Sequence, residues 1–143
     1  MNIIFVDDQP RFKVQDAINY LKDKNLKFNY LILRDSNSAL KYIYTNLSNI
    51  DLIVLDLGLP KFENGIYYNK YEGIFIMEQI LQKTKKIPII INSTSVIHPQ
   101  NNITEKEYLK NLRPAIIEHV EKLTGFYLFE FLETYLIDKI EFI

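Results

Sequence analysis

Residues 52–60 read LIVLDLGLP, a short apolar run that ends at an acidic residue and is followed by two chain breakers. Four consecutive apolar residues are typical of a strand that is buried on both faces, as in a parallel sheet. Gly58 and Pro60 interrupt regular structure immediately afterwards. The stretch therefore predicts a buried strand over Leu52–Leu55, with Asp56 at its carboxyl end.

The same kind of short apolar run recurs along the chain and alternates with helical patterns. Strands are predicted over Ile3–Val6, Tyr30–Leu33, Leu52–Leu55, Ile87–Ile91 and Ala115–Val120. Apolar residues at helical spacing predict helices over Val14–Leu21, Leu40–Leu47, Ile74–Leu81 and Leu128–Leu136. A short helix is predicted over Thr104–Leu112, because Thr104 with Glu107 three residues later forms a capping pattern. Pro10 fits the first turn of the first helix, and Ser36-Asn37-Ser38 supplies cap residues before the second. The alternation implies βαβ units with right-handed crossovers and a parallel sheet.

One of these elements has an alternative interpretation. The segment from Ala115 to Leu123 is also consistent with a helix that continues from Tyr108. Pro114 opposes that helix, because proline removes a hydrogen bond from a helix interior.

Composition narrows the class of protein. The chain has 143 residues, a length that fits one domain over residues 1–143, and its formal net charge of -1 does not favour a nucleic-acid face. It has no cysteine, which excludes disulfides and thiolate zinc sites, and only two histidines. No segment approaches the ~20 apolar residues of a membrane span, and the first residues do not resemble a signal peptide. We therefore expect a cytoplasmic protein.

Chemically useful side chains follow several of the predicted strands. Asp7 and Asp8 end the first strand, Asp56 ends the third, Ser93 follows the fourth and Lys122 lies near the end of the fifth. In an open parallel sheet, ligands bind outside the carboxyl ends of the strands. We therefore expect three carboxylates, a hydroxyl and an amine to converge on one crevice.

This set of groups suits phosphoryl transfer. Adjacent carboxylates repel one another unless a cation lies between them, and ligation by oxygen alone favours Mg²⁺. A carboxylate such as Asp56 can then act as a nucleophile and form an acyl phosphate. Ser93 and Lys122 would stabilise charge on the transferring phosphoryl oxygens.

Three motifs, in this order, resemble the receiver domain of response regulators in two-component signalling, including the chemotaxis receivers. They are VDDQP at Val6–Pro10, DLGLP at Asp56–Pro60 and IPIIINST at Ile87–Thr94. The resemblance spans nearly the whole chain. It implies an α/β fold of the flavodoxin-like, doubly wound type: a five-stranded parallel sheet of order 2-1-3-4-5 with helices on both faces.

The resemblance also implies a role for each site residue. Asp56 would be the phosphoacceptor and a metal ligand. Asp8 would bind Mg²⁺ directly, Asp7 would bind it mainly through water, and the main-chain carbonyl of Gly58 would complete the protein ligands. Ser93 would be the switch hydroxyl.

Two further roles concern the fifth strand. Lys122 would be the phosphate-binding lysine, and His119, three residues earlier, stands where receivers commonly hold an aromatic switch residue. Lys122 is not followed by proline, unlike the lysine of the family, and Arg113-Pro114 is the alternative counterpart. We prefer Lys122, because Gly125–Tyr135 then falls where the last helix should lie.

A further departure lies beside the site. Lys61–Lys70 contains an insertion, so that Gly73, rather than an earlier glycine, fits the start of the third helix.

Each candidate also has an ordinary structural interpretation. Asp7 and Asp8 could cap a helix and Ser93 could cap a loop, since these residue types are favoured there. Lys122 could be solvated, and His119 could be a passive surface group.

The leading hypothesis is a stand-alone response-regulator receiver that accepts a phosphoryl group on Asp56 and signals by a conformational switch. It would not be a turnover enzyme and would catalyse only its own phosphotransfer. Its partners would be a sensor histidine kinase or a phosphotransfer protein, and a downstream protein, with no direct nucleic-acid or membrane contact. Whether it forms a homodimer stays open.

Two other functions compete with this one. The first is an adaptor with a receiver fold that works without phosphorylation. The second is a phosphohydrolase with an Asp nucleophile. Such enzymes place a second Asp two residues after the nucleophile, where this chain has Gly58, which counts against turnover.

Overall fold

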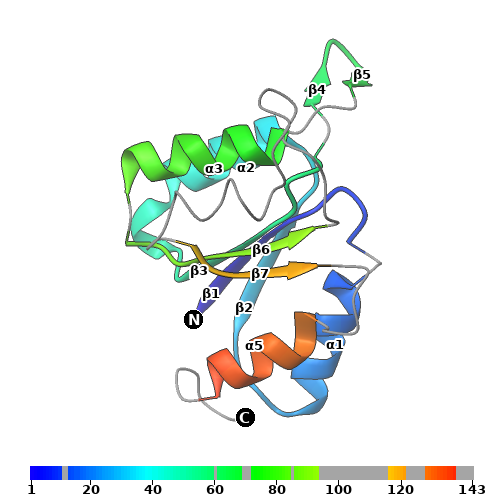
Figure 1. Ribbon diagram of the computed structural model, residues 1–143, viewed down its shortest axis with the longest axis vertical. Helices are drawn as coiled ribbons and strands as arrows, with labels where there is room; N and C mark the ends of the chain where they lie inside the picture. Colours follow the sequence, from blue (N-terminus) through cyan, green and yellow to red (C-terminus); the bar gives the residue numbers. More distant parts are fainter. Residues whose placement is uncertain are drawn as a thin grey trace.

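The computed structural model describes residues 1–10, 13–59, 61–68, 72–84, 86–93, 116–121 and 128–137 (Figure 1). In chain order its elements are β1 (Asn2–Val6), α1 (Val14–Asp23), β2 (Asn29–Leu33), α2 (Ser36–Thr45), a short 3-10 helix (Leu47–Asn49), β3 (Leu52–Leu55), β4 (Lys61–Glu63), β5 (Ile66–Tyr68), α3 (Glu72–Lys83), β6 (Ile89–Ser93), β7 (Ile116–Glu121) and α5 (Leu128–Leu136). The predicted helix over Thr104–Leu112 lies outside the described residues.

The central sheet is parallel, and its order is β2-β1-β3-β6-β7. The predicted parallel sheet and the order of its first four strands are confirmed. β7 pairs with β6, with an irregularity in register between Ile89 and Ile90. β6 extends beyond the apolar run Ile87–Ile91 to Ser93, the residue expected at the end of the fourth strand, so Asn92 and Ser93 both belong to it.

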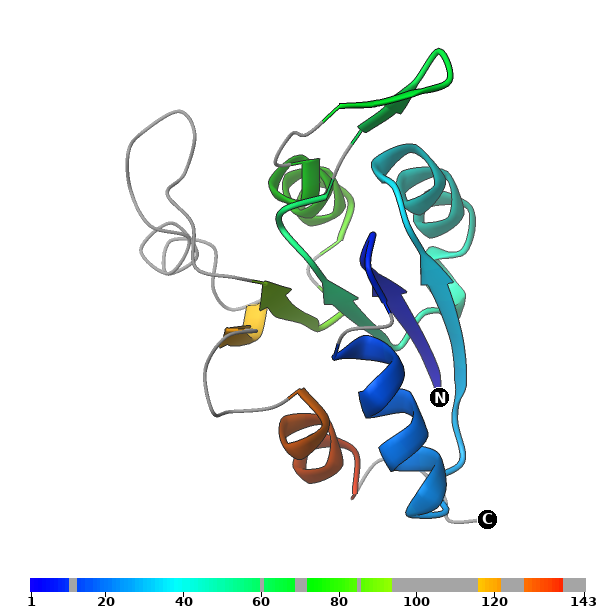
Figure 2. The same ribbon diagram turned by 90° about the vertical axis from the view of Figure 1, so that its right-hand side faces the viewer.

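Helices cover both faces of the sheet (Figures 1 and 2). Along β1, Ile3 and Phe5 pack with α1 and α5, whereas Ile4 and Val6 pack with α2 and α3. This alternation follows from the two-residue period of a strand, and the apolar residues on both faces explain why β1 and β3 read as continuous apolar runs.

A polar contact joins α1 and α5, the two helices that cover the same face of the sheet. The Tyr20 hydroxyl on α1 donates a hydrogen bond of 2.6 Å to the Glu133 carboxylate on α5. This bond raises the pKa of Tyr20 above its ordinary value, with further contributions from burial and from the negative charges of Glu133 and Glu130.

Two helix starts differ from the sequence-based expectation. α1 begins at Val14, so Pro10 precedes the helix and does not lie in its first turn. The cap of α2 is Asp35, whose carboxylate accepts hydrogen bonds of 2.9 Å from the amide and the hydroxyl of Ser38. Asp was as suitable a cap as the serines, and its side chain reaches one turn into the helix.

The predicted insertion after the third strand is a β-hairpin. β4 and β5 pair antiparallel, with Glu63 opposite Ile66, and project beyond α2 and α3 (Figure 1). Asn64 and Gly65 form the turn with φ values of 53° and 77°. Positive φ at both positions defines the type I′ turn that Asn-Gly favours. The Asn-Gly pair was therefore a hairpin signal that the motif-based interpretation did not use.

α3 begins in direct contact with the segment after β3. The Gly73 amide donates to the Leu57 carbonyl at 3.2 Å, and the Glu72 amide donates to the Leu59 carbonyl at 3.1 Å. A Cβ atom on Gly73 would lie 2.1 Å from the Asp56 carbonyl oxygen and 2.4 Å from the Leu57 Cα. Only glycine permits this approach, which agrees with the prediction that Gly73 starts the helix.

We predict that Gly73→Ala forces α3 away from the Asp56–Leu57 backbone. The free energy of unfolding should fall by about 1–3 kcal/mol, the usual cost of overpacking. Amide resonances of Asp56 and Leu57 should shift in NMR spectra, since their backbone must move.

Gly65→Ala is the matched control for this prediction. A Cβ atom there meets nothing within 4 Å, so only the positive φ opposes it, at a cost of about 1–2 kcal/mol. Unchanged Asp56 and Leu57 resonances in Gly73→Ala would contradict the proposed close packing.

Candidate metal and phosphoacceptor site

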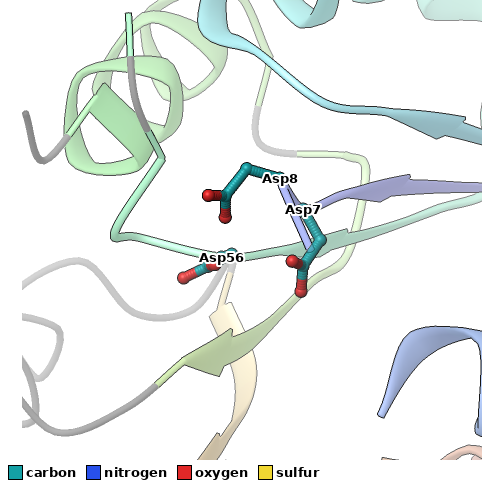
Figure 3. Close-up of side chains that lie close together, drawn as sticks. All are labelled: Asp7, Asp8 and Asp56. Carbon is teal, nitrogen blue, oxygen red and sulfur yellow. The ribbon is translucent and has the colours of Figure 1, made fainter. Parts of the chain in front are cut away.

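Three carboxylates meet at the carboxyl edge of the sheet. Asp7 and Asp8 follow β1 and Asp56 follows β3 (Figure 3). One carboxylate oxygen from each residue lies within 4.8 Å of those of the other two. The sequence-based expectation that these three side chains converge is therefore confirmed.

Pairing of the strands holds these residues in place. Val6 is opposite Leu55 in the parallel ladder, so the residues that follow each of them lie side by side. The Asp56 amide donates to the Val6 carbonyl at 2.9 Å, and the Asp7 amide donates to the Leu33 carbonyl of β2 at 2.9 Å. The ladder thus continues one residue beyond the strands and fixes the backbone under both carboxylates.

Local hydrogen bonds orient two of the side chains. Oδ1 of Asp7 accepts the Gln9 amide at 2.8 Å, and Oδ1 of Asp56 accepts the Gly58 amide at 2.9 Å. An Asp that bonds the amide two residues later forms a small turn, which is why the chain bends away after each strand.

The burial of the three residues differs. Asp7 is 1% exposed and Asp56 is 8% exposed, whereas Asp8 is half-buried. Negative charges this close together in a largely buried place repel one another strongly, because the medium screens them less than water does. A bound cation relieves that repulsion. Carboxylate oxygens are the donors that hard divalent cations prefer, so the three residues fit a divalent cation.

The remaining predicted site residues are placed less completely. Gly58 contributes the amide that binds Asp56, while a metal-binding role of its carbonyl stays a prediction. Ser93 is the last residue of β6, opposite Glu121, and His119 lies on β7 opposite Ile91. Their side chains, like the whole of Lys122, lie outside what the structure describes.

The sequence analysis did not identify one further polar residue at this edge of the sheet. Asn92 lies on β6, one residue before Ser93, and is 1% exposed. The only sequence signal was an amide directly after an apolar run, and the predicted strand ended before it.

Among the described residues, no helix is both long and apolar enough to cross a bilayer. Neither a protein-family model nor the sequence of a curated protein matches the chain.

Comparison with solved structures gives several matches to response-regulator receivers. The non-phosphorylated HemR receiver domain from Leptospira biflexa is 23% identical with a TM-score of 0.61, and the match covers 92% of this chain and 87% of that one. The Mn²⁺-bound form of the response regulator Rcp1 is 21% identical with a TM-score of 0.67, over 99% and 98% of the two chains.

A third match is the CheX–CheY–BeF₃–Mg²⁺ complex from Borrelia burgdorferi. It is 17% identical with a TM-score of 0.64, over 99% of this chain and 90% of that one. The fold of this chain is therefore the fold of response-regulator receiver domains, and its acidic cluster lies at the carboxyl edge of that fold's sheet.

Proposed function

We propose that this chain is a receiver domain that accepts a phosphoryl group on Asp56 in a Mg²⁺-dependent reaction. One observation carries the proposal. Carboxylates from the ends of two adjacent central strands come within 4.8 Å of one another, in a fold shared with receiver domains. This is the arrangement that a cation-assisted carboxylate nucleophile requires.

Asp7, Asp8 and Asp56 would hold the metal ion. Its chemical contribution is positive charge, which lets an anionic phosphoryl donor approach an anionic carboxylate. Two of the similar structures are described as complexes with divalent cations, Mn²⁺ in Rcp1 and Mg²⁺ in the CheY complex, which supports a cation in the same fold.

The chain's own part in the reaction is nucleophilic attack. An oxygen of the Asp56 carboxylate forms a bond to phosphorus, and the bond from phosphorus to the donor breaks, with its electron pair leaving on the donor. The Gly58 amide holds Oδ1 of Asp56, so the orientation of the carboxylate is set before the donor arrives. The product is an aspartyl phosphate, and the chain performs this one transfer without catalysing turnover on another substrate.

The phosphoryl group would come from a sensor histidine kinase or a phosphotransfer protein. The signal would pass to a downstream protein in the cytoplasm through a change at β6, β7 and α5. Ser93 and Lys122 would meet the new phosphoryl oxygens, because a phosphoryl group brings about two negative charges and three acceptors.

The assignment of Asp56 is tested by Asp56→Asn. The parent should gain one base-labile phosphoryl group per chain from acetyl phosphate with Mg²⁺, and Asp56→Asn, which keeps the shape but loses the nucleophile, should gain none. Intact mass spectrometry measures both. The same mass increment in the variant would mean that another residue is the acceptor.

Asp7 and Asp8 should contribute unequally to metal binding. Asp8 is the more exposed, and Oδ1 of Asp7 is already engaged by the Gln9 amide. Asp7→Ala should weaken Mg²⁺ binding about tenfold, as expected for a partner that acts through water, and Asp8→Ala should weaken it more.

Titration calorimetry on the parent and both variants decides this point, and the reverse order would contradict direct binding by Asp8. Without metal, both variants should unfold at a higher temperature than the parent, because a mutually repelling carboxylate has been removed.

The switch role of His119 has its own test. Movement of Ser93 towards a phosphoryl group would vacate space behind β6, and a side chain from β7 could turn into it. His119→Ala should leave labelling of Asp56 nearly intact but reduce the shifts of α5 amides caused by beryllofluoride, a phosphoryl mimic. Equal NMR shifts in the parent and the variant would leave His119 as scaffold.

A further inference from the structure

Asn92 is a buried polar residue with unsatisfied hydrogen-bonding atoms. It is 1% exposed, and within the described part of the chain neither its Oδ1 nor its Nδ2 has a hydrogen-bond partner. Buried side-chain amides are nearly always hydrogen-bonded, because an unpaired one loses water and gains nothing in return. An exception of this kind in a central strand calls for a reason.

The register of the sheet places Asn92 beside the acidic site. Val6, Leu55 and Ile91 are opposite one another on β1, β3 and β6, so the next row along the sheet holds Asp7, Asp56 and Asn92. The carboxyl ends of these three strands lie side by side (Figure 2).

The three residues also share a face of the sheet. On each strand, the side chain two residues earlier lies on the same face as the polar residue. These earlier residues are Phe5, Val54 and Ile90, and all three pack in the core beside α1 and α5. Since side chains on a strand alternate, Asp7, Asp56 and Asn92 belong to that same face. Neighbouring strands are about 4.8 Å apart, which puts the amide within reach of a group attached to Asp56.

Asp56 therefore has different neighbours on its two sides. On the β1 side lie Asp7 and Asp8, the negative groups that suit a cation. On the β6 side lies Asn92, which has no charge and carries two N–H donors. The negative field of the carboxylates favours an amide that turns its NH₂ group towards Asp56 and its oxygen away.

We propose that the Asn92 side-chain NH₂ donates a hydrogen bond to a phosphoryl oxygen on Asp56, from the side opposite the metal. This inference rests on the proposed function and adds a phosphoryl-binding residue to it. Before phosphorylation the amide is buried and has no hydrogen-bond partner among the described residues, and the added phosphoryl oxygens would supply acceptors that the bare carboxylate does not place near it. The unsatisfied amide thus favours the phosphorylated form, because phosphorylation removes its cost.

Asn92→Leu tests the proposal, since leucine has nearly the same size and no polar atoms. Beryllofluoride with Mg²⁺ serves as the probe, and its affinity is measured by NMR titration. The variant should bind beryllofluoride about 10- to 100-fold more weakly than the parent, the usual loss for one hydrogen bond to a charged group. Without beryllofluoride it should unfold at a higher temperature, because an unpaired buried amide has been replaced by an apolar group.

Ile90→Val is the matched control. It disturbs the same strand and the same face of the sheet by one methylene, without touching a polar group. It should bind beryllofluoride as the parent does. If Asn92→Leu also binds as the parent does, the proposal is wrong while the phosphoacceptor role of Asp56 stands. If the parent itself does not bind beryllofluoride, the proposed function fails and this inference fails with it.

A second measurement uses the unmodified chain, in case Asn92→Leu does not fold. The side-chain NH₂ resonances of Asn92 should shift when beryllofluoride is added in the presence of Mg²⁺, and should move little with Mg²⁺ alone. Resonances that do not respond to beryllofluoride, or that respond fully to Mg²⁺ alone, would overturn the assignment of the NH₂ group to the phosphoryl side.

Discussion

The parallel pairing of β1 with β3 is the constraint on which the site depends. With Val6 opposite Leu55, the next residue of each strand is an aspartate, and backbone hydrogen bonds extend the ladder to both. A shift of one residue in this register would turn every side chain of one strand to the other face and separate the carboxylates. The close packing of the strand side chains against α2 and α3 on one face and α1 and α5 on the other opposes such a shift, so the core holds together charges that repel one another.

The start of α3 makes a second constraint on the same place. Gly73 lies against the backbone of Asp56 and Leu57 so closely that no side chain fits. Movement of α3 would therefore displace the backbone of Asp56 and Leu57, and movement of that backbone would displace α3.

The acidic cluster and Asn92 are each energetically unfavourable in the unliganded chain, for different reasons. The carboxylates of Asp7, Asp8 and Asp56 concentrate negative charge in a largely buried place, and the Asn92 amide has no hydrogen-bond partner in the part of the chain that the structure describes. In the proposed function, a cation would relieve the repulsion between the carboxylates, and a phosphoryl group on Asp56 would supply acceptors for the Asn92 amide. The repulsion between the carboxylates and the unpaired amide both raise the free energy of the unliganded chain. A ligand that relieves them binds one conformational state better than the other and so shifts the equilibrium between the states.

The sequence by itself determined the order of the parallel strands and the cluster of three carboxylates at their ends. The unbroken apolar runs of β1 and β3 are typical of strands buried on both faces, and Asp7, Asp8 and Asp56 come directly after them. Because the carboxyl ends of parallel strands share an edge, their convergence followed from chain order and strand type alone.

Tertiary structure decided what depends on distances between segments far apart in the chain. The closeness of Gly73 to the Asp56 backbone and the burial of Asn92 in the row of Asp56 both arise from how α3 and β6 pack against β3. An asparagine at the end of an apolar run looks like a loop residue until the register of the neighbouring strand is known. Local patterns report which face a residue takes, whereas its partners across the sheet depend on register, and register is fixed only when the whole core packs.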